Sequence, residues 1–91
     1  MKHNVYFGGA VQSLSFDHAE GSATVGVMAP GGYEFSTGSK ERMDIVSGAI
    51  EVKLPGDDWV EFVAGESFDV PANAKFQVRM TAQVAYVCWF G

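Results

Sequence analysis

The sequence is poor in cysteine, in basic residues and in long apolar runs. Cys88 is the only cysteine, so a disulfide within the chain is impossible, and this cysteine usage is typical of a reducing compartment. Six Lys and Arg against eleven Asp and Glu give a net charge of −5, which argues against sequence-independent binding of nucleic acid, because such binding needs a basic face. No apolar run is long enough for a signal peptide or a membrane span. We therefore expect a cytoplasmic protein without a nucleic-acid or membrane partner.

The residues that are present favour an all-β fold. Of the 91 residues, 47% are hydrophobic and 13% aromatic, which supports one packed domain over residues 1–91. No segment keeps a helical period over three turns. Alternating apolar and polar residues, separated by Gly, Pro and Asp turns, instead predict eight to ten short strands and hence a barrel or sandwich. The clearest are residues 11–16, 23–28, 33–37, 43–46, 50–54, 59–63, 68–70, 75–80 and 84–90.

Two of these segments carry further information. Pro55-Gly56-Asp57-Asp58 is a strong turn signal and predicts a hairpin between residues 50–54 and 59–63. The last segment, 84–90, is apolar on both faces, which is typical of a strand that is covered on both sides. Since no helix is predicted to cover the second face, we expect a homodimer through this C-terminal strand, with Trp89 at the interface.

Two ordered motifs resemble those of the cupin family. Glu41 and Gly48 have the spacing E-x6-G that ends the first cupin motif, and Gly65-x5-Pro71-x-Asn73 is similar to the start of the second, with Asn in place of Gly. Asn is the next best residue where the backbone needs a positive φ. The resemblance implies a single-domain cupin, an RmlC-like jelly-roll β-barrel.

The histidines of a metal-binding cupin are missing from these motifs. Counted from Glu41 and Pro71, the histidine positions fall on Phe35, Thr37 and Phe76. The two histidines that the chain has, at positions 3 and 18, lie outside both motifs. Because a transition metal prefers imidazole or thiolate ligands, Glu41 alone will not hold one, and we predict no bound metal.

One small cupin family is matched more closely. Five phrases resemble the pyrimidine/purine nucleoside phosphorylases: residues 25–28, 33–37, 41–49, 65–71 and 85–88. The resemblance covers residues 6–90. It implies phosphorolysis of purine and pyrimidine ribonucleosides to free base and α-D-ribose 1-phosphate by a homodimer. Inorganic phosphate is then the co-substrate, and no cofactor is implied.

This reaction has an oxocarbenium-like transition state, so it needs an anion cradle, a flat apolar slot and a donor for the leaving base. We predict Glu41 and Thr37 as the catalytic residues, and expect alanine at either position to depress turnover. For Glu41 the alternative is a salt bridge with Arg42, Arg79 or a lysine. The predicted cradle consists of Thr37, Ser39, Lys40 and Arg42, and its alternative is a solvated loop.

Aromatic residues are the candidates for the base slot, because an aromatic face stacks on any base. We predict Tyr33, Phe35, Phe76 and Tyr86 in this role, and the alternative is that they belong to the core. Cys88 is interpreted as small core packing. Two other functions stay open: a non-catalytic cupin that binds a sugar or nucleoside, and a structural β-domain that binds a partner through its last strand.

Overall fold

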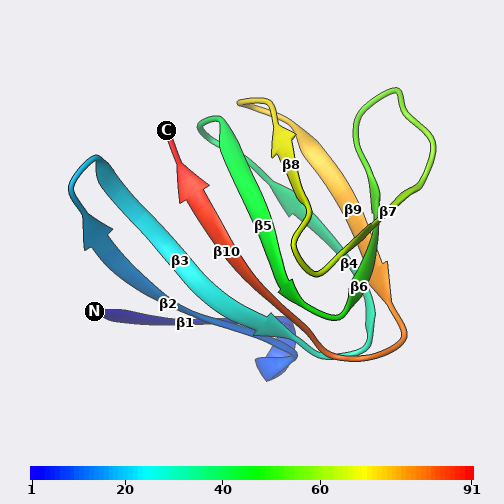
Figure 1. Cartoon of the computed structure of the whole chain (residues 1–91), viewed down its shortest axis with the longest axis horizontal. Coiled ribbons are helices and arrows are strands. Elements are labelled where there is room, and N and C mark those ends of the chain that lie inside the picture. The colour runs from blue at the N-terminus through cyan, green and yellow to red at the C-terminus, as the bar shows by residue number, and fades with distance from the viewer.

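The computed structural model describes the whole chain, residues 1–91, and consists of ten strands and one short 3-10 turn (Figure 1). The strands are β1 (Lys2–Tyr6), β2 (Val11–His18), β3 (Gly21–Met28), β4 (Gly31–Ser36), β5 (Glu41–Ser47), β6 (Ala49–Lys53), β7 (Val60–Val63), β8 (Ser67–Val70), β9 (Lys75–Met80) and β10 (Val84–Phe90). The turn η1 (Phe7–Gly9) joins β1 to β2. No helix has the length and apolar character that a membrane crossing needs.

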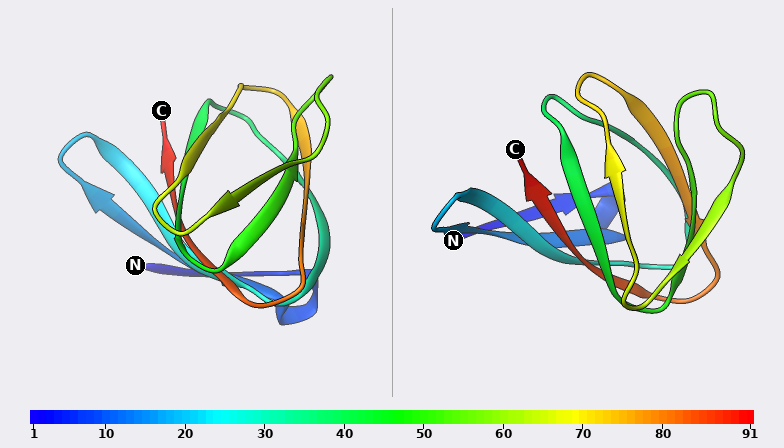
Figure 2. Two further views of the ribbon diagram at one scale, coloured as in Figure 1. Left: turned by 45° about the vertical axis from the view of Figure 1, so that its right-hand side comes forward. Right: turned by 45° about the horizontal axis from the view of Figure 1, so that its top comes forward.

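The strands form two antiparallel sheets that face each other (Figures 1 and 2). The larger sheet has the order β1-β2-β3-β10-β5-β8, and the smaller has the order β4-β9-β6-β7. The β2–β3 hairpin extends beyond the rest of the two sheets, at the left of Figure 1, and β1 lies along it. The all-β fold class predicted from the sequence is confirmed.

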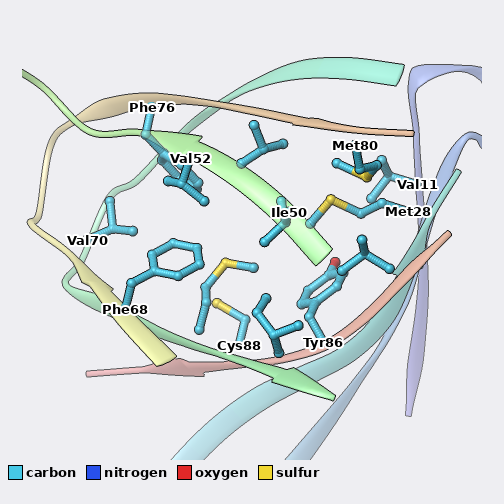
Figure 3. Packing of buried hydrophobic residues seen from close by; sticks show 14 residues of the cluster. Val11, Met28, Ile50, Val52, Phe68, Val70, Phe76, Met80, Tyr86 and Cys88 are labelled. Carbon is cyan, nitrogen blue, oxygen red and sulfur yellow. The ribbon is translucent and has the colours of Figure 1, made fainter. Parts of the chain in front are cut away.

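Alternation along the strands explains how the core forms between the sheets. Phe76, Val78 and Met80 of β9 are buried, whereas the polar residues between them face solvent. The predicted hairpin is also present, because β6 and β7 pair on either side of the Pro55–Asp58 turn, from Ala49 opposite Val63 to Val52 opposite Val60. Figure 3 shows the resulting core, into which side chains project from both sheets.

The central strand of the larger sheet is β10, which pairs with β3 on one side and β5 on the other. Val84, Tyr86 and Cys88 point into the core, whereas Ala85, Val87 and Trp89 lie on the opposite, outer face and are half-buried. Trp89 packs against Phe16, and its Nε1–H donates a hydrogen bond of 2.7 Å to Asp44 Oδ2. The single chain therefore covers only one of the two apolar faces of this strand.

Candidate active site

A cavity of about 610 Å³ opens where the N-terminal strand and η1 approach β4. Its wall also includes residues of β2, β3, β5, β9 and β10, so it lies between the two sheets at one side of the core. Ten of its 15 lining residues are hydrophobic, and none is Lys or Arg. The polar lining residues are Ser13, Thr24, Glu34, Ser36 and Glu41. A mostly apolar cavity with a few converging polar groups is typical of a small-molecule site.

Glu41 is the carboxyl group of this cavity whose pKa departs from its usual value. It is the first residue of β5 and lies opposite Phe90 of β10. Partial burial raises the pKa of its carboxyl group above the usual 4.5. The Cys88 thiol donates a hydrogen bond of 3.3 Å to Oε1, which lowers the pKa, but the effect of burial is larger. The two ion pairs of the structure join Arg42 to Asp44 and Arg79 to Glu51, so Glu41 is not in the salt bridge that was its alternative role.

Two neighbouring groups of β10 are held in their neutral forms. Burial raises the pKa of the Cys88 thiol strongly, with a further increase from the nearby Glu41 charge. Burial also raises the pKa of Tyr86 to about 12, against a smaller lowering by its hydrogen bond with Ser13. The Tyr86 ring fits because residue 26 is glycine: a Cβ there would lie 2.7 Å from the Tyr86 hydroxyl oxygen. Cys88 belongs to the core, as predicted, and it also lines the cavity beside Glu41.

Three of the four aromatic residues predicted for a base slot lie on the cavity wall, namely Phe35, Phe76 and Tyr86. Phe35 and Phe76 pack on each other with ring centroids 5.7 Å apart. Figure 3 shows Phe76 and Tyr86 projecting into the space between the sheets from opposite sides. Tyr33 does not line the cavity, because its hydroxyl donates a 2.7 Å hydrogen bond to Ala29 O and its ring lies behind that of Phe7.

The residues predicted as an anion cradle do not reach this cavity. Thr37 is buried at the end of β4, whereas Ser39 and Lys40 are exposed in the loop that follows. Arg42 comes directly after Glu41 on β5, so it points to the opposite face of the sheet. There its guanidinium donates hydrogen bonds to Asp44 Oδ1 at 3.1 Å and to Ser67 Oγ at 3.2 Å.

The Thr37 hydroxyl joins two parts of the chain that are far apart in sequence. It donates a hydrogen bond of 2.6 Å to Pro71 O and accepts one of 3.0 Å from Ala74 N–H. Its hydrogen-bonding capacity is therefore used by the turn between β8 and β9. Thr37, for which the sequence predicted a catalytic role, is therefore part of the framework of the fold and does not line the cavity.

We therefore expect Thr37→Val to act on stability instead of on chemistry. The substitution keeps the shape of the side chain but removes a buried hydroxyl, which leaves Ala74 N–H without its partner and costs about 1–3 kcal/mol. Urea unfolding measures this loss. Thr37→Ser keeps the hydroxyl and should lose less than half as much. A Thr37→Val protein of unchanged stability but much reduced turnover would contradict this assignment.

Several cavity residues were not predicted from the sequence. Tyr6 and Phe7 come from the N-terminal segment, Ser13 and Thr24 from β2 and β3, and Phe90 from the end of β10. The available signal was the aromatic pair Tyr6-Phe7 followed by Gly8-Gly9, because two consecutive glycines indicate a turn. As to metals, the structure contains no group of three His, Cys, Asp or Glu side chains placed to hold an ion.

Comparisons of the sequence with a family model and with known proteins point to one and the same family. The sequence model of the family described as "Pyrimidine/purine nucleoside phosphorylase" matches residues 1–90. A protein of that name from Pseudomonas entomophila is 56% identical over 88 residues, which cover 96% of this chain and 94% of the relative. One from Pseudomonas aeruginosa is 52% identical, with 96% of this chain and 95% of the relative covered.

Solved structures agree with this match. A protein of unknown function from Vibrio parahaemolyticus superimposes with a TM-score of 0.93 at 45% identity, covering 96% of this chain and 94% of its own. A cupin superfamily protein from Desulfitobacterium hafniense gives a TM-score of 0.72 at 12% identity, covering 97% of this chain and 80% of its own. The second likeness concerns the fold alone, and it confirms the cupin-type fold that the two motifs predicted.

Proposed function

The chain belongs to the pyrimidine/purine nucleoside phosphorylase family, and we propose that its 610 Å³ cavity is where a ribonucleoside reacts with inorganic phosphate. Family membership confirms the resemblance found in the sequence and the enzyme class that it implied. The chain is a nucleoside phosphorylase, and the products are a free base and α-D-ribose 1-phosphate.

The observation that carries the site assignment is the environment of Glu41. A carboxyl group in a largely apolar cavity, with no cation beside it, holds its proton to a higher pH than usual. Perturbed groups of this kind cluster at functional sites. A protonated Glu41 is the donor that phosphorolysis requires, because a nucleobase leaves poorly as an anion.

The proposed step is a direct displacement by phosphate at C1′ of the ribose. A phosphate oxygen forms the bond to C1′ of the ribose while the bond from C1′ to the base nitrogen breaks, and its electron pair stays on the base. Glu41 gives its proton to the departing base, as a general acid does. The proton that hydrogen phosphate loses on becoming an ester then returns to the Glu41 carboxylate. No covalent enzyme intermediate is needed.

Phosphate binding and the protonation of Glu41 support each other in this arrangement. No Lys or Arg lines the cavity, so the polar donors on its wall are the hydroxyl groups of Ser13, Thr24 and Ser36. An ionised Glu41 would repel phosphate at short range. Phosphate therefore favours the neutral carboxyl group, which is also the form that can donate a proton.

A direct assay tests this function. Purified protein is incubated with uridine and with adenosine, each with and without phosphate, and free base and ribose 1-phosphate are measured. We expect both products only when phosphate is present. Base release without phosphate would indicate a hydrolase, and no release at all would favour a cupin that only binds its ligand.

We further propose that the protein is a homodimer that packs through the outer face of the larger sheet. This face presents neighbouring apolar residues from three adjacent strands, because Val25 of β3 lies opposite Leu14 of β2 and Val87 of β10. Leu14 and Val25 are 41% and 45% exposed, which is unusual for the middle of a sheet. A second copy would give β10 the cover on both faces that its sequence predicts.

A reducing cytoplasm remains the proposed location, since Cys88 is a free thiol.

Val25→Glu tests this dimer. A charge at the centre of the apolar face should convert the protein to a monomer at micromolar concentration, because a buried unpaired carboxylate is costly. Sedimentation velocity measures the change in mass. Val60→Glu is the matched control, since Val60 is 49% exposed on β7 in the other sheet. A wild-type protein that sediments as a monomer would refute the proposal, as would a dimer that Val25→Glu leaves intact.

A further inference from the structure

The turn η1 at the cavity mouth has a backbone that its sequence only partly explains. Phe7, Gly8 and Gly9 have φ values of +52°, +67° and +100°. Glycine adopts such values freely, but a bulky residue with a side chain at Cβ does so rarely. Apart from Asn73, Phe7 is the only residue of the chain other than glycine with positive φ. An unfavourable conformation of this kind persists where the surroundings or a function require it.

Core packing does not account for this conformation. Phe7 is 51% exposed and does not belong to the hydrophobic core. Its ring lies against Tyr33, with centroids 4.9 Å apart, and against Phe35, with centroids 5.6 Å apart and planes at 88°. The backbone of η1 thus holds a half-exposed aromatic ring against two others, and both Phe7 and Phe35 line the cavity.

Neighbouring bonds fix the turn in this position. Ala10 N–H donates to Phe7 O at 3.2 Å, and the Gln12 side chain donates to Gly9 O at 3.0 Å. On the far side of the ring, the Tyr33 hydroxyl is held by Ala29 O. Tyr33, which does not reach the cavity itself, therefore supports Phe7 from behind.

We propose that Phe7 is the residue on which the nucleobase stacks, and that it determines the affinity for the nucleoside. This assignment rests on the proposed function, which places the nucleoside in the same cavity. The free part of the Phe7 ring and the ring of Phe35 form two aromatic surfaces at nearly a right angle. A base can stack on the first of these surfaces while its edge meets the second.

The chemistry of phenylalanine fits a site that accepts both classes of base. Its ring offers no donor or acceptor, so it contributes the same kind of contact to a purine and to a pyrimidine. Since stacking grows with the overlap of the rings, a purine should gain more from Phe7 than a pyrimidine. Selectivity between individual bases is then left to the polar groups of the wall.

Substitution of Phe7 tests the proposal by equilibrium titration with uridine and adenosine in the absence of phosphate, together with steady-state kinetics. Phe7→Ala should raise Kd and KM for nucleosides about tenfold, the usual effect of losing one stacking partner, and more for adenosine than for uridine. The KM for phosphate should stay within about twofold, whereas Phe7→Trp should bind nucleosides at least as tightly as the wild type. Val60→Ala, at a residue of similar exposure outside the cavity, should change none of these values.

A stability measurement separates stacking from damage to the fold. Phe7→Gly removes the same ring as Phe7→Ala but also removes the unfavourable φ, so its unfolding midpoint should equal or exceed that of Phe7→Ala. A Phe7→Ala protein that is folded and binds nucleosides as the wild type does would overturn the assignment. If nucleosides bind in a Phe7-dependent way but phosphate releases no base, the assignment stands and phosphorolysis fails. If the wild type binds no nucleoside, both proposals are wrong.

Discussion

Replacing Gly48 with alanine is expected to lower the free energy of unfolding by about 2–5 kcal/mol, because a conformational cost of about 1–2 kcal/mol and an overpacking cost of about 1–3 kcal/mol add. Gly48 joins β5 to β6 with φ at +92°, a value that a residue with Cβ adopts at a cost. A Cβ at this position would also lie 2.6 Å from Gln83 O. That oxygen is part of the backbone, so it cannot turn aside as a flexible side chain would. This contact explains in physical terms why the first motif ends in glycine.

The chain provides a control that separates the two costs. Gly65 has nearly the same φ, +91°, but no atom lies within 4 Å of the position where its Cβ would be. Gly65→Ala should therefore lose only the conformational part, about 1–2 kcal/mol. Urea unfolding of both variants is compared at one protein concentration, since association with a second copy would add to stability. Equal losses in the two variants would show that the contact with Gln83 is relieved without cost.

Local patterns in the sequence correctly predicted features that depend on neighbouring residues, such as the two faces of a strand and the position of a tight turn. The alternation over residues 75–80 gave the inward and outward faces of β9 correctly, and the turn at residues 55–58 gave the β6–β7 hairpin. β1 was not predicted, because Lys2–Tyr6 has no regular alternation and becomes a strand by pairing with β2, from Lys2 opposite Ser15 to Tyr6 opposite Val11. The strands predicted over residues 11–16 and 23–28 are longer in the structure, since β2 continues to His18, which pairs with Gly21 at the start of β3.

In the candidate site, too, local patterns predicted the residues within strands but not those in loops. Glu41 and Phe76 reach the cavity because each lies within a strand, where alternation fixes the direction of the side chain. Spacing in a motif gives a position along the chain but not the direction of a loop residue. Ser39 and Lys40 therefore lie away from the cavity although they directly precede Glu41. The two glycines of η1 indicate a turn, but the contact of Phe7 with Tyr33 and Phe35 of β4 depends on the tertiary fold, which no local pattern encodes.

Replacing Glu41 with glutamine should reduce kcat about 100-fold or more, since a positioned general acid contributes about 10²–10⁴-fold. Glutamine keeps the size of the side chain and can accept the Cys88 thiol hydrogen bond, but it has no proton to give. Phosphorolysis of uridine measures the loss. Glu61→Gln makes the same change of charge on β7, outside the cavity, and should leave turnover within about twofold of wild type. A Glu41→Gln enzyme with wild-type turnover would remove this carboxyl group from the mechanism.

The pH dependence of the wild type should carry the same signature. In the proposed step Glu41 reacts in its protonated form, so kcat should fall as the pH rises through its raised pKa. The ionisation of Glu41 should also lower the stability of the fold as the pH rises. A carboxyl group whose pKa is higher in the folded state than the usual 4.5 contributes stability below pH 4.5, and this contribution is lost as the pH rises through the folded-state pKa.

Glutamine is neutral at every pH and escapes that loss. The Glu41→Gln protein should therefore gain stability relative to the wild type as the pH rises above 4.5, while it is nearly inactive throughout. Thermal unfolding at a series of pH values measures the difference, and Glu61→Gln again provides the comparison. If the stabilities of the wild type and of Glu41→Gln changed with pH in the same way, burial would not raise the pKa of Glu41. Burial would then explain neither the proposed proton donation by Glu41 nor the stability that the wild type loses when Glu41 ionises.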